Sequence, residues 1–439
     1  MRRVLLVTYY FPPLGGAGTK RMVKFARYLP DFGWEPVVLT VRQPYYSIHE
    51  PEGFTELPDS LVIERTGAFF PKQIARSLIQ RRSGTADGWG GAMPRRRAWA
   101  EWIKSVAYPV TCVPDEYIGW YPWAVRAGKR IIRQYGIDAI ISSSPPNTPH
   151  LIARTLSRST GLPWLADFRD PWNTLLPWYN PHGWAPREWL ESYMERRAVD
   201  TAARVSGVTE PMLADFRERL GGLIDVKGVV ISNGYDPADL EGVEAEVFPR
   251  PWTILHAGSF YPWRSPQVFL QGLALWLQQN PERRAETSVV FLGQVESDTA
   301  RQAAVLGVDD VLRIEPGRPY RDSARAILGA DLLLLIPGSH RNLKYMMTTK
   351  IYDYLAAGKP ILAVSGESAA STFLQAHPEF ARVANAESPE SVAGALETLY
   401  QDAKSGRIEP LAGEALRPWH RRETVRTLAQ TLDCMTEAL

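Results

Sequence analysis

The sequence predicts an α/β protein made of two doubly wound domains, each built on a parallel β-sheet. Short apolar runs alternate with longer stretches of helical periodicity along most of the 439 residues, as expected for strands joined by crossover helices. A chain of this length is also too long for one ordinary hydrophobic core. Residues 241–251, which are rich in acidic residues and proline, separate the alternating pattern into two halves.

Apolar runs predict the strands of each domain. In the first half they fall at residues 4–8, 36–40, 61–64, 138–142, 163–167, 204–208 and 228–232. In the second half they fall at residues 252–257, 288–292, 311–315, 331–336, 360–364 and 381–384. We therefore expect a first domain at 1–245, interrupted by an insertion at about 66–122, and a second domain at 252–412. A last helix at 415–439 is expected to cross back to the first domain.

The composition is that of a globular protein, with 45% hydrophobic and 22% charged residues. The net charge of +2 argues against a general nucleic-acid-binding protein. Two cysteines, Cys112 and Cys434, make no disulfide framework and fit a reducing cytoplasm. Because no apolar run approaches the roughly 20 residues needed to cross a bilayer, we expect a cytoplasmic protein.

The insertion at about 66–122 is rich in tryptophan and arginine. Arg95, Arg96 and Arg97 precede a helical pattern that carries Trp99 and Trp102 on one face. In one interpretation the aromatic side chains pack on the first domain and the arginines are solvated. In the other, the segment attaches the protein peripherally to the anionic inner face of a membrane, since each cation near such a surface contributes roughly 1 kcal/mol.

The most informative stretch of the sequence is residues 348–364. Lys350 and Asp353 open a helix, Gly358 ends it, and Pro360 opens a buried strand. This order places backbone N–H groups, a lysine and a carboxylate at one helix start, where an anion is favoured. A carboxylate beside a phosphate suits a ribose, because both ribose hydroxyls can donate hydrogen bonds. The stretch therefore predicts a nucleotide site.

A second candidate site follows the first strand. Tyr10 precedes a run that contains Gly15 and Gly16, and a helix is expected to start near Thr19. Glycines allow the backbone to approach a phosphate or sugar closely, and a helix start favours negative charge. The spacing matches neither the dinucleotide fingerprint nor the P-loop, and a tight turn without a ligand is the alternative.

Five motifs occur in an order that resembles family 4 of the glycosyltransferases. They are PPLGGAG at 12–18, SPPNTPH at 144–150, LADFRDPW at 165–172, ISNGYD at 231–236 and KIYDYLAAGKP at 350–360. The resemblance covers nearly the whole chain and is weakest between about 66 and 110. It implies the GT-B architecture, in which two doubly wound Rossmann-like domains face each other across a cleft. It also implies transfer of a sugar from a nucleoside-diphosphate sugar with retention of anomeric configuration.

The resemblance implies that the second domain holds the donor. Asp353 would bind the ribose hydroxyls. The first glutamate of the family's acidic pair falls on Tyr345, and this departure from the family leaves open how the donor sugar is held. Arg264 and Lys350 are the implied catalytic cations, since a charge-assisted contact to the departing diphosphate stabilises the transition state. Lys344 flanks the same helix, and a surface lysine is the more credible interpretation for it.

Further donor contacts are implied in three segments. Ser259 lies in the glycine-initiated loop before Arg264. Residues 311–315 would contact the base through the backbone at Arg313 and Ile314. Gly15 and Gly16 of the first domain would complete the cradle for the donor.

Polar residues at the end of the strand at 163–167 point to the acceptor or the reacting sugar. Asp167, Arg169 and Asp170 lie together there, and the carboxyl ends of strands in doubly wound sheets face the ligand. Asp167 and Arg169 are candidate catalytic groups, and the candidate acceptor contacts are Asp170, Tyr10 and His150. The alternatives are an internal ion pair for the charged cluster and a capping or core role for His150.

No cluster of His, Cys and carboxylate residues has the spacing of a metal site, so we expect no metal and no cofactor. The nucleotide sugar would be a substrate, with a UDP-sugar favoured over a GDP-sugar. The leading hypothesis is a retaining glycosyltransferase of hexosyltransferase type in cell-surface polysaccharide or glycolipid biosynthesis, with a lipid-linked or saccharide acceptor. The alternatives are a nucleotide-sugar epimerase or hydrolase on the same scaffold and a non-catalytic nucleotide-sugar binder.

Overall fold

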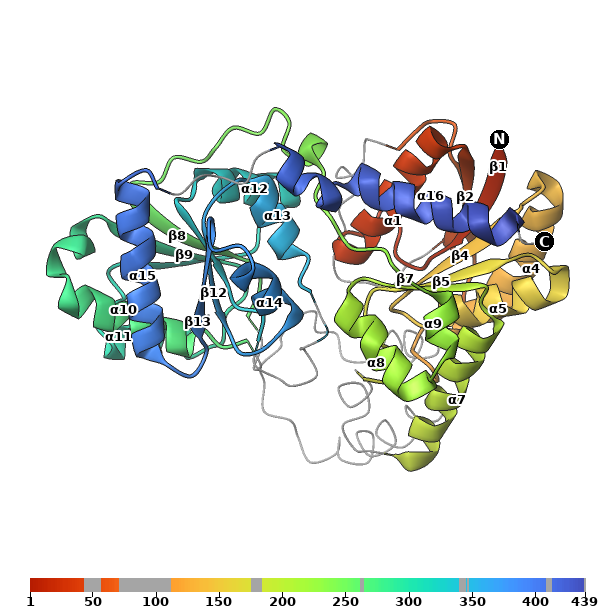
Figure 1. The fold of residues 1–439 in the computed structure, drawn as a ribbon, viewed down its shortest axis with the longest axis horizontal. Coiled ribbons are helices and arrows are strands. Elements are labelled where there is room, and N and C mark those ends of the chain that lie inside the picture. The colour runs from red at the N-terminus through yellow and green to blue at the C-terminus, as the bar shows by residue number, and fades with distance from the viewer. Residues whose placement is uncertain are drawn as a thin grey trace, which may run out of the picture. The chain divides into compact units, whose positions relative to one another are not determined.

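The computed structural model describes residues 1–42, 57–70, 112–174, 184–260, 264–338, 345, 347–407 and 413–437. The chain forms two compact units (Figure 1). The first unit contains Met1–Ile231 together with Val425–Leu439, and the second contains Ser232–Thr424. Each unit is a parallel sheet flanked by helices, which is the α/β class that the sequence predicts.

The first unit has a seven-stranded parallel sheet in the order β3–β2–β1–β4–β5–β6–β7. The chain moves outward from β1, returns to the centre for β4 and then moves outward on the other side, which is doubly wound topology. The strands are β1 (Arg2–Val7), β2 (Trp34–Val41), β3 (Val62–Thr66), β4 (Ala139–Ser144), β5 (Trp164–Phe168), β6 (Arg204–Gly207) and β7 (Gly228–Val230). The described helices before residue 232 are α1 (Ala17–Tyr28), η1 (Leu29–Phe32), η3 (Ile118–Trp120), α4 (Tyr121–Tyr135), α5 (Thr148–Thr160), α7 (Ala185–Thr201), α8 (Glu210–Leu220) and α9 (Leu223–Lys227).

The central strands of this sheet are covered on both faces. Leu6 of β1 lies opposite Val38 of β2 and Ile141 of β4, and all three side chains are fully buried. Parallel strands buried in this way need apolar residues at successive positions, which explains the continuous apolar runs in the sequence.

The C-terminal helix α16 (Arg421–Glu437) completes the core of the first unit. Its apolar side chains, including Leu428 and Leu432, join the buried cluster formed by β1, β2 and α1. Asp433 fastens the helix by accepting hydrogen bonds from Arg2 Nη2 at 2.5 Å and from the indole N–H of the buried Trp34 at 2.9 Å. The last turns of the chain therefore belong to the first sheet.

The second unit has a six-stranded parallel sheet in the order β10–β9–β8–β11–β12–β13. This order repeats that of the first six strands of the first unit. The strands are β8 (Trp252–Ala257), β9 (Thr287–Leu292), β10 (Leu312–Glu315), β11 (Leu332–Leu335), β12 (Ile361–Ser365) and β13 (Ala381–Asn385). The described helices are η4 (Pro237–Asp239), α10 (Gln267–Gln279), η5 (Pro281–Ala285), α11 (Thr299–Val305), α12 (Tyr320–Gly329), α13 (Lys350–Ala356), α14 (Ala369–Gln375), α15 (Pro389–Lys404) and η7 (Gly413–Trp419).

Every strand predicted from the sequence is present, with ends that differ by a few residues at most. The division of the chain lies elsewhere than the composition suggests, because it falls after Ile231 and not within residues 241–251. That segment is held by the second unit: Glu246 N–H donates to Arg325 O at 2.9 Å, and the Glu246 carboxylate accepts from Arg318 Nη1 at 2.5 Å. None of the described helices is both long and apolar enough to cross a membrane.

Candidate active site

The candidate site of the second unit lies at the switch point of its sheet. β8 and β11 are neighbours, but the chain leaves them in opposite directions, so the segments that follow these two strands diverge at the carboxyl edge. Gly258 follows β8, Pro337 follows β11 and helix α13 begins at Lys350. Ligands of doubly wound sheets bind at such an edge, so these segments are where a ligand is expected.

Lys350 lies against the side chain of the buried His256 at the end of β8. The Nδ1 atom of His256 is 2.9 Å from Leu334 O, a carbonyl that can only accept, so Nδ1 carries the ring proton. The other nitrogen, Nε2, is therefore an acceptor, and it faces Lys350 Nζ at 3.3 Å. Burial and the neighbouring Lys350 lower the pKa of His256 well below its ordinary value, which keeps the ring neutral. His256 thus orients the amino group of Lys350 without neutralising it.

Gly258 leaves the space that Lys350 occupies. Its φ is 123°, a conformation that side chains rarely adopt, and a Cβ at this position would overlap Lys350 Nζ and Cε. Gly293, which follows β9 with φ 144°, has its own close approach to the Gly258 backbone. Glycine is therefore needed at the end of β8 for a cation to lie directly on the strand end.

Arg264 brings a second cation to the same edge. Its Nε donates to Pro337 O at 2.9 Å, which ties the loop after β8 to the segment after β11. Burial and the charge of Arg264 lower the pKa of Lys350 to about 7, and the Asp353 carboxylate opposes that shift. The positive charges of Lys350 and Arg264 destabilise each other. An anion bound between them would remove this repulsion and so explain the arrangement.

Asp353 lies in the first turn of α13, on the same edge as Lys350. Its Oδ1 accepts a hydrogen bond from Tyr320 Oη at 3.2 Å. The neighbouring Tyr354 accepts from Ala257 N–H at 3.1 Å and lies 3.3 Å from Leu334 O, so it anchors α13 to β8 and β11. Lys344 lies outside the described residues.

The remaining donor candidates have weaker side-chain roles. Ser259 accepts a hydrogen bond from Gln294 N–H at 3.4 Å, which places it in the loop beside Gly258. Arg313 and Ile314 lie on β10, the edge strand of the sheet, and the Arg313 side chain is bound by Glu315 at 2.5 Å. Any contact of these two residues with a base would have to use the backbone, as the resemblance implies.

In the first unit, the loop after β1 and the end of β5 come together. Gly16 has φ 90° and caps α1, while Gly15 O accepts from Thr19 Oγ1 at 3.2 Å. Arg169 reaches this loop: its guanidinium lies 5.6 Å from the Tyr10 ring centroid, and a Cβ on Gly18 would overlap it. The loop and the predicted cluster thus share one corner of the carboxyl edge.

Arg169 is held by the turn after β4, and Asp170 comes next in the chain. Arg169 Nε donates to Ser144 O at 3.0 Å, and Nη2 contacts Pro145 O. Burial lowers the pKa of this guanidinium, while the Asp170 carboxylate opposes the shift. Asp170 and Tyr10 therefore remain candidates for contact with an acceptor, and the catalytic role of Arg169 stays a prediction.

Asp167 is an internal ion pair and not an available catalytic group. Its side chain is buried and receives two hydrogen bonds from Arg21, from Nη2 at 2.7 Å and from Nε at 3.0 Å. The hydroxyls of Ser143 and Ser206 donate to the same carboxylate, each at 2.7 Å. These charged contacts hold the pKa of Asp167 below its ordinary value despite burial. The alternative stated from the sequence, an internal ion pair, replaces the catalytic assignment.

His150 is a core residue and not an acceptor contact. The ring is fully buried, with Nδ1 2.7 Å from Ser142 Oγ and Nε2 2.8 Å from Ser144 Oγ. Burial lowers its pKa to about 3, so it is neutral. Both ring nitrogens have partners within the fold, which leaves none for a ligand.

Sequence reasoning missed His256, Tyr320 and Arg21. One signal was available, since His256 is the single titratable residue in a mostly apolar strand that ends directly before Gly258. Nothing local marks Tyr320, whose partner Asp353 lies 33 residues away. Among the described residues, no group of three or more His, Cys, Asp or Glu side chains is placed to hold a metal ion. The Arg95–Arg97 segment lies outside the described part of the chain.

Two doubly wound units with a candidate anion site at the switch point of the second define a protein of the GT-B architecture. Residues 15–234 match the family described as the Glycosyl transferase 4-like domain. The chain belongs to this family.

Individual relatives are distant. The D-inositol 3-phosphate glycosyltransferase of Thermobispora bispora is 26% identical over 193 residues, and this match spans 42% of the chain and 43% of that relative. Sucrose-phosphate synthase from Thermosynechococcus elongatus superposes with a TM-score of 0.59 at 14% identity, covering 100% of this chain and 97% of that one. Anabaena HepE in complex with UDP-glucose superposes with a TM-score of 0.57 at 13% identity, covering 100% of both chains. At these identities the solved structures support the fold.

We expect Asp167→Asn to act on stability. The substitution leaves the buried Arg21 guanidinium without a counter-charge, which should lower the free energy of unfolding by about 3–5 kcal/mol. Chemical denaturation of this variant and of the exposed control Asp59→Asn measures the difference. A parental unfolding midpoint combined with lost activity would contradict the structural role and return Asp167 to the reacting groups.

We also expect nucleoside-diphosphate binding to be linked to protonation of Lys350. With a pKa of about 7 in the free protein, this amine is largely neutral at pH 8.5, so binding an anion there should take up close to one proton. The affinity for UDP should accordingly fall as the pH rises from about 6.5 to 8.5. Calorimetry at pH 8.5 in two buffers of different ionisation enthalpy measures the uptake.

The matched variants for this measurement are Lys350→Met and Lys359→Met. Lys350→Met should abolish the proton uptake and weaken UDP binding. Lys359 precedes β12 at the amino end of the strand, so its loss should change neither quantity. Proton uptake that survives in Lys350→Met would assign the linkage to another group.

Proposed function

We propose that this protein is a retaining glycosyltransferase that transfers a sugar from a nucleoside-diphosphate sugar, with UDP-sugars favoured, to a lipid-linked or saccharide acceptor. The observation that carries the proposal is the pair of neighbouring cations at the switch point of the second unit, Lys350 and Arg264, with Asp353 on the same edge. Two cations suit a diphosphate, and a carboxylate beside them suits a ribose, whose two hydroxyls can both donate hydrogen bonds. The family to which the chain belongs supports the same reaction.

In this proposal the second unit stabilises the leaving group. As the bond between the anomeric carbon and the phosphate oxygen breaks, negative charge grows on the diphosphate, and Lys350 and Arg264 stabilise it more strongly than in the ground state. His256 acts as a positioning residue by holding the amino group of Lys350 at the strand end. Asp353 binds the ribose equally before and during the reaction.

Retention is proposed to follow from attack on the face that the leaving group departs from. The acceptor hydroxyl forms its bond to the anomeric carbon while the departing phosphate oxygen takes the hydroxyl proton, so no protein nucleophile is needed. The commitment of the Asp167 carboxylate to Arg21 supports this route, because it removes the most prominent acidic candidate for a nucleophile. We place the reaction in cell-surface polysaccharide or glycolipid biosynthesis, where such acceptors occur.

The first test is a thermal-shift screen with UDP, GDP, ADP and their sugars, because a ligand that binds the native state stabilises it. Incubation of a stabilising nucleotide sugar with and without a lipid-linked acceptor then identifies the reaction. Acceptor-dependent release of the nucleoside diphosphate supports transfer, and the anomeric configuration of the product tests retention. Acceptor-independent conversion of the donor would instead identify an epimerase or hydrolase, and binding without turnover a non-catalytic binder.

We expect Arg264→Ala and Asp353→Asn to affect different kinetic parameters. Arg264→Ala removes a contact that strengthens in the transition state, so kcat should fall more than roughly tenfold, equivalent to about 1.5–3 kcal/mol. Asp353→Asn removes uniform binding, so KM for the donor should rise with a smaller change in kcat.

Two controls accompany these variants. Arg313→Ala should be close to the parent, because only its backbone is proposed to contact the base, and Asp322→Asn removes an exposed acid from α12. An Arg264→Ala enzyme with parental kcat would remove Arg264 from the diphosphate site. Parental UDP affinity in Asp353→Asn would make Asp353 a surface acid.

We also propose peripheral contact with an anionic membrane, carried by the sequence of Arg95–Arg97 and Lys104 in the insertion. The protein should co-sediment with vesicles containing phosphatidylglycerol at low salt and be released at high salt, because the attraction is electrostatic and screened. A variant with Arg95, Arg96 and Arg97 changed to glutamine should lose this binding. Negligible binding of the parent to anionic and neutral vesicles alike would refute the membrane contact and leave the transferase proposal standing.

A further inference from the structure

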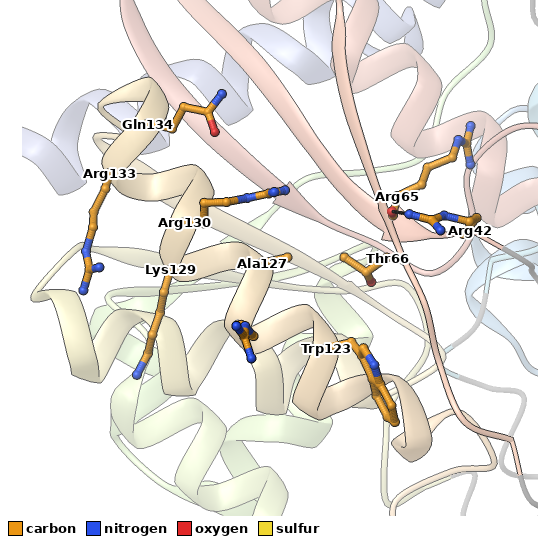
Figure 2. A pocket seen from close by; sticks show the side chains of 10 residues that line it. Arg42, Arg65, Thr66, Trp123, Ala127, Lys129, Arg130, Arg133 and Gln134 are labelled. Atoms are coloured by element: carbon orange, nitrogen blue, oxygen red, sulfur yellow. Dashed lines mark hydrogen bonds between the residues drawn. The ribbon is translucent and has the colours of Figure 1, made fainter.

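A groove of about 760 Å³ lies on the first unit between helix α4 and the carboxyl ends of two strands (Figure 2). Arg42 directly follows β2, and Arg65 and Thr66 are the last residues of β3. The facing wall belongs to α4, where Trp123 and Arg130 contribute to the lining. Figure 2 shows Arg130 extending from α4 toward the side of the groove that carries Arg65.

The described residues that line this groove make it strongly cationic, and none of them is acidic. Its cations are Arg42, Arg65, Arg126, Lys129, Arg130 and Arg133. Within the described part of the chain, only Arg130 of these six is paired with a carboxylate, that of Glu64 at 2.8 Å. A solvated protein surface ordinarily intersperses charges of both signs, so this arrangement favours a site for an anion.

The charge is concentrated in one stretch of the chain. Residues 121–160, which include α4, β4 and α5, contain six Lys and Arg residues and a single acid, Asp138, and therefore carry a net charge of +5. The whole chain carries +2, so the remainder carries −3. Like charges held this close repel each other, and a bound anion would relieve that repulsion.

Arg65 connects the groove to the loop after β1. Its side chain is partly buried, and Nη2 donates to Pro12 O at 2.5 Å. Burial lowers the pKa of this guanidinium, which nevertheless stays charged. Pro12 lies in the same loop as Gly15 and Gly16, the segment that Arg169 also reaches. The groove therefore opens beside the corner of the first unit where acceptor contacts are expected.

We propose that this groove binds the phosphate or diphosphate group of an anionic acceptor. Guanidinium groups match phosphate oxygens with paired N–H donors, and Arg42, Arg65, Arg126 and Arg133 surround the groove with such donors. The inference rests on the proposed function, because it takes the first unit to be the acceptor side. A sugar phosphate and a lipid-linked diphosphate sugar share this chemistry. Trp123, which is 45% exposed, offers an additional apolar contact that would favour a lipid-linked acceptor.

The test compares a groove variant with a charge-matched control. Arg126→Gln/Arg133→Gln removes two lining cations from α4 for which no carboxylate partner is described. Arg158→Gln/Arg196→Gln removes two exposed cations from other helices that do not line the groove. Binding of inorganic pyrophosphate and of farnesyl diphosphate is measured by calorimetry at about 50 mM salt. Saturating UDP is present so that the diphosphate site of the second unit is occupied.

The parent and the control should bind a diphosphate probe, and the groove variant should bind it at least tenfold more weakly. Equal affinity for pyrophosphate and farnesyl diphosphate would assign a free phosphate group, and tighter binding of farnesyl diphosphate would assign a lipid-linked one. Either result supports the proposal.

Three outcomes would overturn this inference. The first is absence of probe binding in the parent, and the second is equal probe affinity in the two double variants. The third is arginine-dependent binding of phosphatidylglycerol vesicles without binding of either probe. That result would make the groove a membrane-docking surface. Binding of UDP is scored separately. A protein that binds UDP but no probe loses this inference alone, and one that binds no nucleotide loses the proposed function.

Discussion

The buried ion pair between Arg21 and Asp167 is the interaction on which the first unit depends. Through it, helix α1 is attached to β5, and the two serines that donate to the same carboxylate come from β4 and β6. Arg21 also donates to Ile231 O at 2.8 Å, at the point where the chain leaves the unit. One carboxylate therefore links a helix to three strands, and this link helps to position the loop between β1 and α1.

The two units treat buried charge in opposite ways. In the first, a carboxylate and a guanidinium neutralise each other, so the pair is stable without a ligand. In the second, Lys350 faces a neutral histidine and a second cation, and its only nearby counter-charge within the described residues is Asp353. An arrangement of this kind lowers the affinity of the amine for its own proton. Under the proposed function, a bound diphosphate would reverse that effect, and the repulsion between the two cations would favour binding of an anion.

The sequence predicts the fold well because the signal for a buried parallel strand is local. Runs such as residues 4–8 and 360–364 are apolar at successive positions, whereas an amphipathic surface helix places polar residues between its apolar ones. The meeting of Arg264 and Lys350 was predictable for a related reason, since both follow strands that end at the same edge. The position of the boundary between the two units was not predictable. Residues 241–251 resemble a linker in composition, but Glu246 is bound to α12 and to Arg318 just before it.

Asp167 and His150 show where such reasoning stops. A charged residue at a strand end has the same appearance in the sequence whether it meets a ligand or an internal partner. The partner of Asp167 is 146 residues distant, and both partners of His150 are serines of the preceding strand. Likewise, the tautomer of His256 depends on a carbonyl 78 residues away. These outcomes are decided by tertiary contacts, which no local pattern records.

The return of residues 425–437 to the first sheet has a consequence for the order in which the protein folds. The second unit is, in connectivity, an insertion between the two parts of the first. During synthesis residues 232–424 are complete before residues 425–437 of α16 have emerged, so the second unit can fold first although it comes later in the chain. The first unit must wait with the surface of β1, β2 and α1 uncovered until the last helix is made. Until α16 is made, this exposed apolar surface is therefore open to aggregation.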